Sequence, residues 1–344
     1  MYFFRQICDK PIAFHWFKKV MSIIDLKSYV SQGYSGICVP DSSELNPYLS
    51  MRDFKHHAQT AFFTLPISVL SKIIQFRSDG NTDGFILIKG MPCDEKLIRT
   101  PERHEEVRSR PAFVSEYCLT MVGSHLGELY GFIQESEGSL FNNIRPLPQS
   151  ASVQSSESSD VFLELHTDIA FHEFRPDFLL LYCLRQDHHQ QAKTGVACVR
   201  KALHMLSKEI IDELRKPNFS FAYDLSFGNF LGKSNKLKNC PILEGDLSDP
   251  YMTYDSDLIT PLNEKSSSAL RELDLALRST METVVLEPGD LIIIDNRRTS
   301  HSRTKFKAYF DGYDRWLQRV FVKQDIDAVR KRLPDQVPVI REII

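Results

Sequence analysis

The sequence lacks Cys-x-x-Cys pairs, a strong charge of either sign and, in its first hundred residues, any long uncharged run. Its seven cysteines are scattered along 344 residues, and their odd number argues against a disulfide framework. The wide spacing also argues against a zinc ribbon, and such cysteines suit a reducing compartment. We therefore expect a cytoplasmic protein.

The missing charge and the missing apolar run exclude several partners. Arg5, Asp9 and Lys10 interrupt the N-terminus, so it has no clean signal-peptide core. The longest uncharged stretch of the first hundred residues, Ala58 to Ser71, is too short to span a bilayer. The formal net charge of -3 gives no basic footprint for nucleic acid or an anionic membrane. We expect neither as a partner.

Apolar residues make up 42% of the sequence, which is enough to form a substantial core. No repeat, low-complexity tract or linker divides the chain, so we expect a single domain over residues 1–344. Residues 1 to about 80 are expected to be mainly helical, and the strand-rich core to span about 84–325. Residues 228–265 are rich in Gly, Ser, Asn, Asp and Pro, which predicts a long mobile lid loop.

Short strands flanked by helices predict one β-sandwich or barrel-like core with helices packed outside. Helices are expected at 111–134, 201–216 and 267–281, and the Ser/Gln-rich stretch 149–160 is expected to be an exposed loop. The strand candidates are GFILIKGMP (84–92), SLFNNIRPLP (139–148), VFLELHTD (161–168), PDFLLLYCLR (176–185), GVACVR (195–200), VVLEPGDLIIIDN (284–296) and RWLQRVFVK (315–323).

The stretch ELHTDIAFH places two metal-ligand types one residue apart. In an extended strand His166 and Asp168 project to the same side. A third candidate is His301, just after the apolar run LIIIDN. Two histidines and one carboxylate on one face of a metal are typical of non-haem Fe(II) oxygenases, whose open positions take a keto acid and O2. Zinc is the weaker alternative, and a lone buried histidine bonded to a neighbour is the ordinary explanation of such a pair.

Arg315 and Arg319 stand four residues apart on a predicted strand and therefore share a face. Buried arginines need anionic partners, and a guanidinium fits a carboxylate through two parallel hydrogen bonds. The alternative is a surface ion pair with Asp311 or Asp314.

Ordered blocks over roughly residues 84 to 325 resemble the clavaminate synthase-like branch of Fe(II)/2-oxoglutarate-dependent oxygenases, in the TauD-like superfamily. This branch includes hydroxylases that act on the β or γ carbon of free amino acids. The blocks are GFILIKGMP, QSS (154–156), HTDIAFHEFRPDFLLLYCLR, Thr194, YDSDL and DNRRTSHSRTKFKAYFDGYDRWLQRVFV.

The resemblance implies an α+β fold with a double-stranded β-helix, or jelly-roll, core and a role for each matching residue. His166, Asp168 and His301 would bind Fe(II), while Arg315 and Thr194 would hold the far carboxylate of 2-oxoglutarate. For the amino-acid substrate the matching positions are Arg319 at the α-carboxylate, Gln134 and Glu135 at the α-amino group, and Asp255 at the side chain or amine. Asp257, two residues later, is either a second acidic contact for a cationic side chain or a solvated loop residue.

One departure from the branch is Asp168, because relatives usually have Glu there. Asp is usual in the wider superfamily, so iron binding is still implied, but a group that can contact the substrate amine is lost. The carboxylate also argues against a halogenase, which leaves that position open for chloride. His172, His188 and His189 are not expected to bind iron. Arg303 could pair with a carboxylate near the iron or simply anchor its loop.

The predicted function is hydroxylation of an unactivated C–H of a free, basic L-amino acid such as lysine, arginine or ornithine, with Fe(II), 2-oxoglutarate and O2. The alternatives are a desaturase or cyclase, a hydroxylase of asparagine-type or carrier-bound amino acids, and a non-catalytic jelly-roll binding protein. The sequence does not predict an oligomeric state.

Overall fold

The computed structural model describes residues 22–223, 227, 239–327 and 338–341. None of the helices within these ranges is both long and apolar enough to cross a membrane. The helices are α1 (Met51–Ala61), α2 (Ile67–Asp79), α3 (Val114–Leu126), α4 (Val199–Ala202), α5 (Lys208–Leu214) and α7 (Glu264–Thr280). Short 3-10 helices are η1 (Leu26–Gln32), η2 (Phe62–Thr64), η3 (His104–Ser109), η4 (Ser136–Gly138), η5 (Pro148–Ser150) and η6 (Leu203–Met205).

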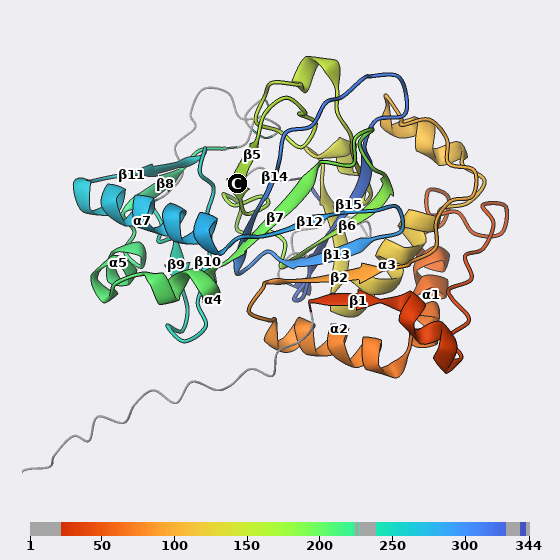
Figure 1. Cartoon of the computed structure of the whole chain (residues 1–344), viewed down its shortest axis with the longest axis horizontal. Coiled ribbons are helices and arrows are strands. Elements are labelled where there is room, and N and C mark those ends of the chain that lie inside the picture. Colours follow the sequence, from red (N-terminus) through yellow and green to blue (C-terminus); the bar gives the residue numbers. More distant parts are fainter. Residues whose placement is uncertain (1–21, 224–226, 228–238, 328–337, 342–344) are drawn as a thin grey trace, which may run out of the picture.

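Two main sheets form the core (Figure 1). The large sheet has the order β1 (Ile23–Asp25), β2 (Phe85–Lys89), β13 (Leu291–Asp295), β6 (Phe178–Arg185), β15 (Trp316–Lys323), β3 (Glu128–Phe132) and β16 (Val339–Ile340), and β4 (Asn142–Ile144) also pairs with β15. The small sheet has the order β12 (Glu282–Val285), β7 (Lys193–Cys198), β14 (Thr299–Arg303) and β5 (Leu163–His166). Two further pairs are β8 (Phe219–Phe221) with β11 (Ile259–Pro261), and β9 (Leu243–Glu244) with β10 (Tyr251–Met252).

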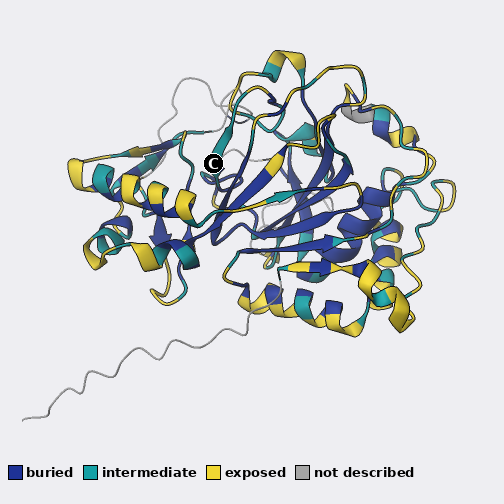
Figure 2. Cartoon of the chain, in the orientation of Figure 1, coloured by how far each residue is buried: buried dark blue, intermediate teal, exposed yellow. Residues whose placement is uncertain are grey.

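Alternating side chains give the large sheet two buried faces. In β2, Phe85 and Leu87 belong to the apolar cluster that also contains Val196 of the small sheet, whereas Ile86 and Ile88 belong to the cluster under the helices. Because neighbouring side chains of a strand point to opposite faces, an unbroken apolar run fits a strand that is covered on both sides. Figure 2 shows these central strands as buried along most of their length.

Helices cover the outer sides of the core. α2 and α3 bury Phe76 and Leu119 in the same cluster as Ile86, so they cover the large sheet. α4, α5 and α7 pack with β8 to β11 beside the small sheet, at the left of Figure 1. α7 begins with a capping box, in which the side chains of Asn263 and Ser266 each accept a hydrogen bond from the backbone N–H of the other.

The architecture confirms the predicted α+β jelly roll with flanking helices, but two predicted helices differ. The helix expected over 111–134 ends at Leu126, and residues 128–132 form β3 instead. At Gly127 the chain passes so close to the backbone of Lys323 that a Cβ would lie 2.3 Å from its carbonyl oxygen. The helix expected over 201–216 breaks into α4, η6 and α5, because Ser207 leaves the helical conformation and caps α5.

Candidate metal centre

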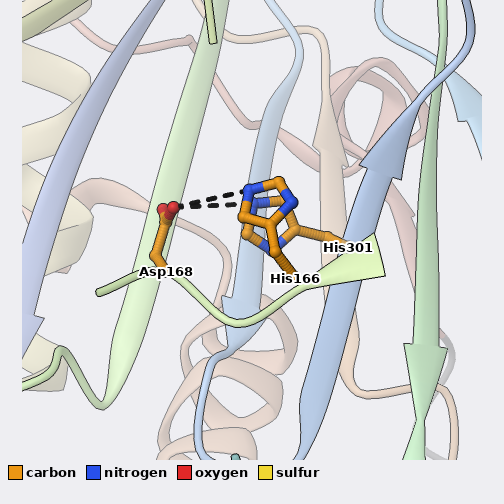
Figure 3. A group of neighbouring side chains, drawn as sticks. All are labelled: His166, Asp168 and His301. Atoms are coloured by element: carbon orange, nitrogen blue, oxygen red, sulfur yellow. Dashed lines mark ion pairs between the residues drawn. The ribbon is translucent and has the colours of Figure 1, made fainter. Parts of the chain in front are cut away.

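Three ligand-type side chains meet at the edge of the small sheet (Figure 3). β5 ends at His166, and β14 places His301 directly opposite it in the antiparallel register. The Oδ1 atom of Asp168 lies 3.7 Å from Nε2 of His166 and 3.9 Å from Nε2 of His301. Both imidazoles therefore point their Nε2 atoms toward one carboxylate.

Hydrogen bonds hold the imidazole of His166 and the backbone of Asp168 in place. Nδ1 of His166 donates to the carbonyl of Glu164 at 2.8 Å, which leaves Nε2 as the lone-pair nitrogen. The backbone N–H of Asp168 donates to the side chain of Asn296 at 2.9 Å, and the Asn296 amide donates back to the Asp168 carbonyl at 3.1 Å. Asn296 lies in the turn before β14, so one amide ties the two ligand segments together.

The expectation that His166 and Asp168 share one strand was wrong. β5 ends at His166, and Asp168 begins a turn in which Ile169 has a φ of 54°. The side chain of Thr167 does point elsewhere, and its hydroxyl donates to the carbonyl of Thr299 at 3.0 Å. The two ligands converge because the chain turns after the strand rather than because of strand periodicity.

The electrostatics fit a divalent cation. Burial, with His166 and Arg319 nearby, lowers the pKa of His301 to about 3, so its imidazole is neutral near pH 7. Burial alone would raise the pKa of the Asp168 carboxyl, but Arg319 and the two histidines outweigh it and the net pKa is lowered. Two imidazoles and one carboxylate leave coordination positions open, which suits Fe(II) better than a closed structural zinc site.

A small cavity of about 50 Å³ opens beside these ligands, and its lining includes His301, Thr194, Arg303, Arg315 and Arg319. Arg315 is buried, and among the described residues no carboxylate lies within ion-pair distance of it. Burial lowers the pKa of Arg315, which reflects the cost of a charge held away from water. The alternative considered for Arg315, a surface ion pair with Asp311 or Asp314, does not form.

Arg303 anchors a loop, the second of the two roles considered for it. Its guanidinium donates to the carbonyl and hydroxyl of Ser158 and to the carbonyl of Val161. Burial, reinforced by the neighbouring Arg315, lowers the pKa of Arg303 to about 9. The loop that it holds belongs to the Ser/Gln-rich stretch 149–160, in which residues 152–154 are exposed as expected, whereas Ser158 and Ser159 are buried.

A larger cavity of about 580 Å³ includes His166 and Asp168 in its lining. Arg319 crosses its floor, donating to Glu135 at 2.7 Å and to both oxygens of Asp168 at 3.3 Å. Gln134 also lines the cavity, and its buried Oε1 has no hydrogen-bond partner among the described residues. The residues predicted for the substrate, Gln134, Glu135, Asp255, Asp257 and Arg319, all line this cavity.

Asp255 both caps a turn and faces the cavity. Its Oδ1 accepts from the backbone N–H groups of Asp257 and Leu258, at 3.0 Å each, and its backbone forms a bridge with His166. Burial raises the pKa of Asp255 to about 6, against the opposing effect of His166 and the two amides. Asp257 is exposed at the rim, and burial together with Glu164 raises its pKa.

The lid loop expected over 228–265 needs correction. Residues 228–238 lie outside the described residues, whereas residues 239–263 contain β9, β10 and β11, and α7 starts at Glu264. The part that carries Asp255 is fixed to the metal strand: Ser256 N donates to the Leu165 carbonyl at 3.1 Å, and Thr167 N donates to the Tyr254 carbonyl at 2.6 Å. At residues 254–256, backbone hydrogen bonds to β5 and Thr167 thus take the place of the expected mobile loop.

Sequence reasoning missed two kinds of site residue. Asn296 holds the Asp168 turn, and only its place directly after the buried strand hinted at this. Asn142 and Ser155 line the large cavity with buried oxygens that lack partners among the described residues, and the sequence pointed to them only as parts of the strand candidate 139–148 and the block QSS (154–156). His172 accepts from the backbone N–H of Phe174 and stays outside the ligand group, as expected.

The family model described as taurine catabolism dioxygenase TauD, TfdA family matches residues 58–321. The chain belongs to this family. It is 34% identical over 280 residues to clavaminate synthase 2 of Streptomyces clavuligerus, covering 81% of this chain and 86% of the relative. It is 37% identical over 278 residues to L-asparagine oxygenase of Streptomyces coelicolor, covering 80% and 82%. With L-lysine 3-hydroxylase of Catenulispora acidiphila the identity is 31% over 290 residues, covering 83% and 80%.

Solved structures agree with this family. Asparagine oxygenase in complex with Fe(II), 2S,3S-3-hydroxyasparagine and succinate superimposes with a TM-score of 0.80 at 32% identity, covering 94% of this chain and 100% of that one. These matches confirm the predicted recognition, jelly-roll fold and enzyme class. The protein is an iron- and 2-oxoglutarate-dependent oxygenase.

Proposed function

We propose that this oxygenase hydroxylates a free L-amino acid with a cationic side chain, such as lysine, arginine or ornithine, at its β or γ carbon. His166, Asp168 and His301 would hold the iron, and Arg315 with Thr194 would hold 2-oxoglutarate. The iron, with 2-oxoglutarate and O2, supplies the oxidising power for an unactivated C–H. The chain binds both organic molecules, orients the target carbon and excludes water.

The pair formed by Arg319 and Glu135 supports a free amino acid, and it is the observation that carries this proposal. The two side chains meet at 2.7 Å on the cavity floor. A zwitterionic amino acid offers its α-carboxylate to Arg319 and its α-ammonium group to Glu135. It can therefore replace the one ion pair between these residues with two. A carrier-bound or peptide-linked residue has no free α-carboxylate and would leave Arg319 without this exchange.

The acidic rim supports a cationic side chain. In the described part of the chain neither Asp255 nor Asp257 has a lysine or arginine within ion-pair distance, whereas Glu164 is neutralised by Arg278 at 2.7 Å. A substrate ammonium or guanidinium would provide the missing positive charge. The lysine hydroxylase relative is consistent with this chemistry.

An asparagine-type substrate is the second candidate. The unpartnered oxygens of Gln134 and Asn142 could accept hydrogen bonds from a primary amide as well as from an ammonium group. Asparagine oxygenase is also among the relatives of highest identity. A desaturase or cyclase would use the same residues, so only the product distinguishes it from a hydroxylase.

One screen tests these candidates together. Each of the twenty amino acids, and ornithine, is incubated with the Fe(II)-loaded enzyme, 2-oxoglutarate and O2, and succinate release is measured. We expect the largest stimulation from a basic amino acid and a product heavier by one oxygen atom. Stimulation by asparagine alone would favour the second candidate, a product lighter by two hydrogens would indicate desaturation, and no stimulation by any of them would contradict the free amino-acid proposal.

A further inference from the structure

Two buried guanidinium groups face the small cavity. Arg303 and Arg315 are 5% and 6% exposed and line it together with Thr194. Their Cζ atoms lie 5.1 Å and 5.9 Å from the centre of the same ring, that of Phe306. Neither forms an ion pair with a carboxylate in the ranges that the structure describes. Two like charges held together away from water are unfavourable without an anion between or beside them.

Arg303 joins this charged cavity to the wall of the larger one. Its terminal nitrogens donate to neutral oxygens of Ser158 and Val161, and its Nε donates to the carbonyl of Thr304. The preceding residues of the same loop, Ser155 and Glu157, line the large cavity, and Ser156 lines both cavities. The charge of Arg303 therefore sits beside one cavity while its hydrogen bonds shape the other.

We propose that Arg303 is a positioning residue that couples 2-oxoglutarate binding to the order of the substrate-cavity wall, residues 150–161. The far carboxylate of the co-substrate lies beside both guanidinium groups and reduces the repulsion between Arg315 and Arg303. With this repulsion reduced, Arg303 holds Ser158 and Val161 firmly, and the wall is set before the amino acid enters. This inference rests on the proposed assignment of Arg315 to 2-oxoglutarate.

Coupling of this kind is reciprocal. If 2-oxoglutarate stabilises the ordered wall, a more ordered wall also favours 2-oxoglutarate. Loss of the Arg303 charge should lower the affinity for 2-oxoglutarate. Loss of its planar guanidinium, which donates several hydrogen bonds at once, should loosen the wall even when the charge remains. The two consequences can be separated with two variants.

The test uses the Fe(II)-loaded full chain without O2, with and without 2-oxoglutarate, and no amino acid. Amide hydrogen exchange reports on the wall through the N–H groups of Ser158, Ser159 and Asp160, which donate to Ser155 and Ala151 carbonyls inside the loop. Calorimetry gives the 2-oxoglutarate affinity of the same samples. The matched control is Lys305→Gln, which removes an exposed positive charge two residues away.

In the native protein we expect 2-oxoglutarate to slow exchange of these amides by about tenfold or more. In Arg303→Gln the slowing should be lost and the affinity for 2-oxoglutarate should fall by about tenfold. In Arg303→Lys the affinity should be largely kept and the slowing lost, and Lys305→Gln should behave as the native protein. Retention of the slowing in both Arg303 variants, or no slowing in the native protein with bound 2-oxoglutarate, would overturn the proposal.

Failure of the underlying assignment is distinguishable. If Arg315→Gln binds 2-oxoglutarate as tightly as the native protein, the co-substrate site is assigned wrongly. If Arg315→Gln loses the co-substrate while Arg303→Gln keeps both affinity and slowing, only the role of Arg303 is wrong.

Discussion

Arg315 and Arg319 stand four residues apart, yet their surroundings differ. Arg319 already meets two carboxylates, those of Glu135 and Asp168, at the floor of the large cavity. Arg315 faces the small cavity without a carboxylate at ion-pair distance among the described residues. Arg319 can exchange its present partners for those of a zwitterionic amino acid. Arg315 can bind the carboxylate of an anion in the small cavity.

Replacing Arg315 with Ala should therefore affect the co-substrate. A buried carboxylate would lose its charge-assisted partner, which should raise the KM for 2-oxoglutarate by about 10²-fold or more. Steady-state succinate formation measures this, with Arg319→Ala as the comparison, where the KM for the amino acid should rise instead. An unchanged KM for 2-oxoglutarate in Arg315→Ala would contradict the assignment.

Asp255 offers a second test at the level of a single side chain. Asp255→Asn keeps the shape and the turn, since an amide oxygen can accept the same two backbone hydrogen bonds, but it removes the charge. Turnover of a basic amino acid should fall by about 10-fold or more because the desolvated cation loses its counter-ion. Succinate release without substrate should change little, so equal losses in both reactions would point to structural damage instead.

At the scale of the elements, Asp249 attaches the segment before Asp255 to α4 and to the turn between β13 and β14. This carboxylate accepts from Arg200 at 2.7 Å and from Arg298 at 2.9 Å and 2.7 Å, and three residues later Met252 N donates to the Arg297 carbonyl at 2.8 Å. Burial opposes ionisation, but the two arginines prevail and lower the pKa of Asp249 to about 2. The arginines on α4 and in the β13–β14 turn thus hold the segment that leads to Asp255.

Asp249→Asn should lower the free energy of unfolding by about 2 kcal/mol near pH 7, given a pKa below its usual value in the folded state. The folded-state pKa is depressed, so the native advantage is complete above about pH 4 and is lost as the pH falls toward 2. Denaturant unfolding of both proteins at pH 7 and pH 3 measures this. Asp246→Asn is the comparison: its exposed carboxylate accepts hydrogen bonds from Ser248 and forms no ion pair among the described residues, so the loss should be smaller at pH 7.

The elements also show where sequence reasoning reaches its limit. The runs FILIK and LIIID were correctly predicted as strands, because burial on both faces leaves an unmistakable apolar pattern. From strand periodicity we predicted that His166 and Asp168 project to the same side. Their side chains do meet, but β5 ends at His166 and the turn that follows brings Asp168 to it. The ordered course of residues 239–263 was missed, because its anchors are backbone contacts with β5 and arginines distant in sequence.

At the scale of the whole molecule, the candidate metal centre gathers parts from both sheets. His166 and His301 belong to the small sheet, and Asp168 follows its edge strand. Arg319, which contacts Asp168, comes from the middle of the large sheet. The site therefore depends on how the two sheets face each other, which the order of residues along the chain does not reveal without the fold.

A metal bound at this position should stabilise the whole fold, because it binds only the arrangement in which the three ligand segments have met. At a free Fe(II) concentration of 100 times its dissociation constant, the gain is about 2.7 kcal/mol, equivalent to a few degrees in Tm. Removing the metal with a chelator under anaerobic conditions should lower the Tm by that amount, and Fe(II) should restore it.

The His301→Ala protein should fold, melt at the same temperature with and without Fe(II), and release no succinate. The control His189→Ala changes an exposed histidine outside the ligand group and should keep the full response to Fe(II). Full activity or an undiminished Fe(II) response in His301→Ala would show that the metal is held elsewhere.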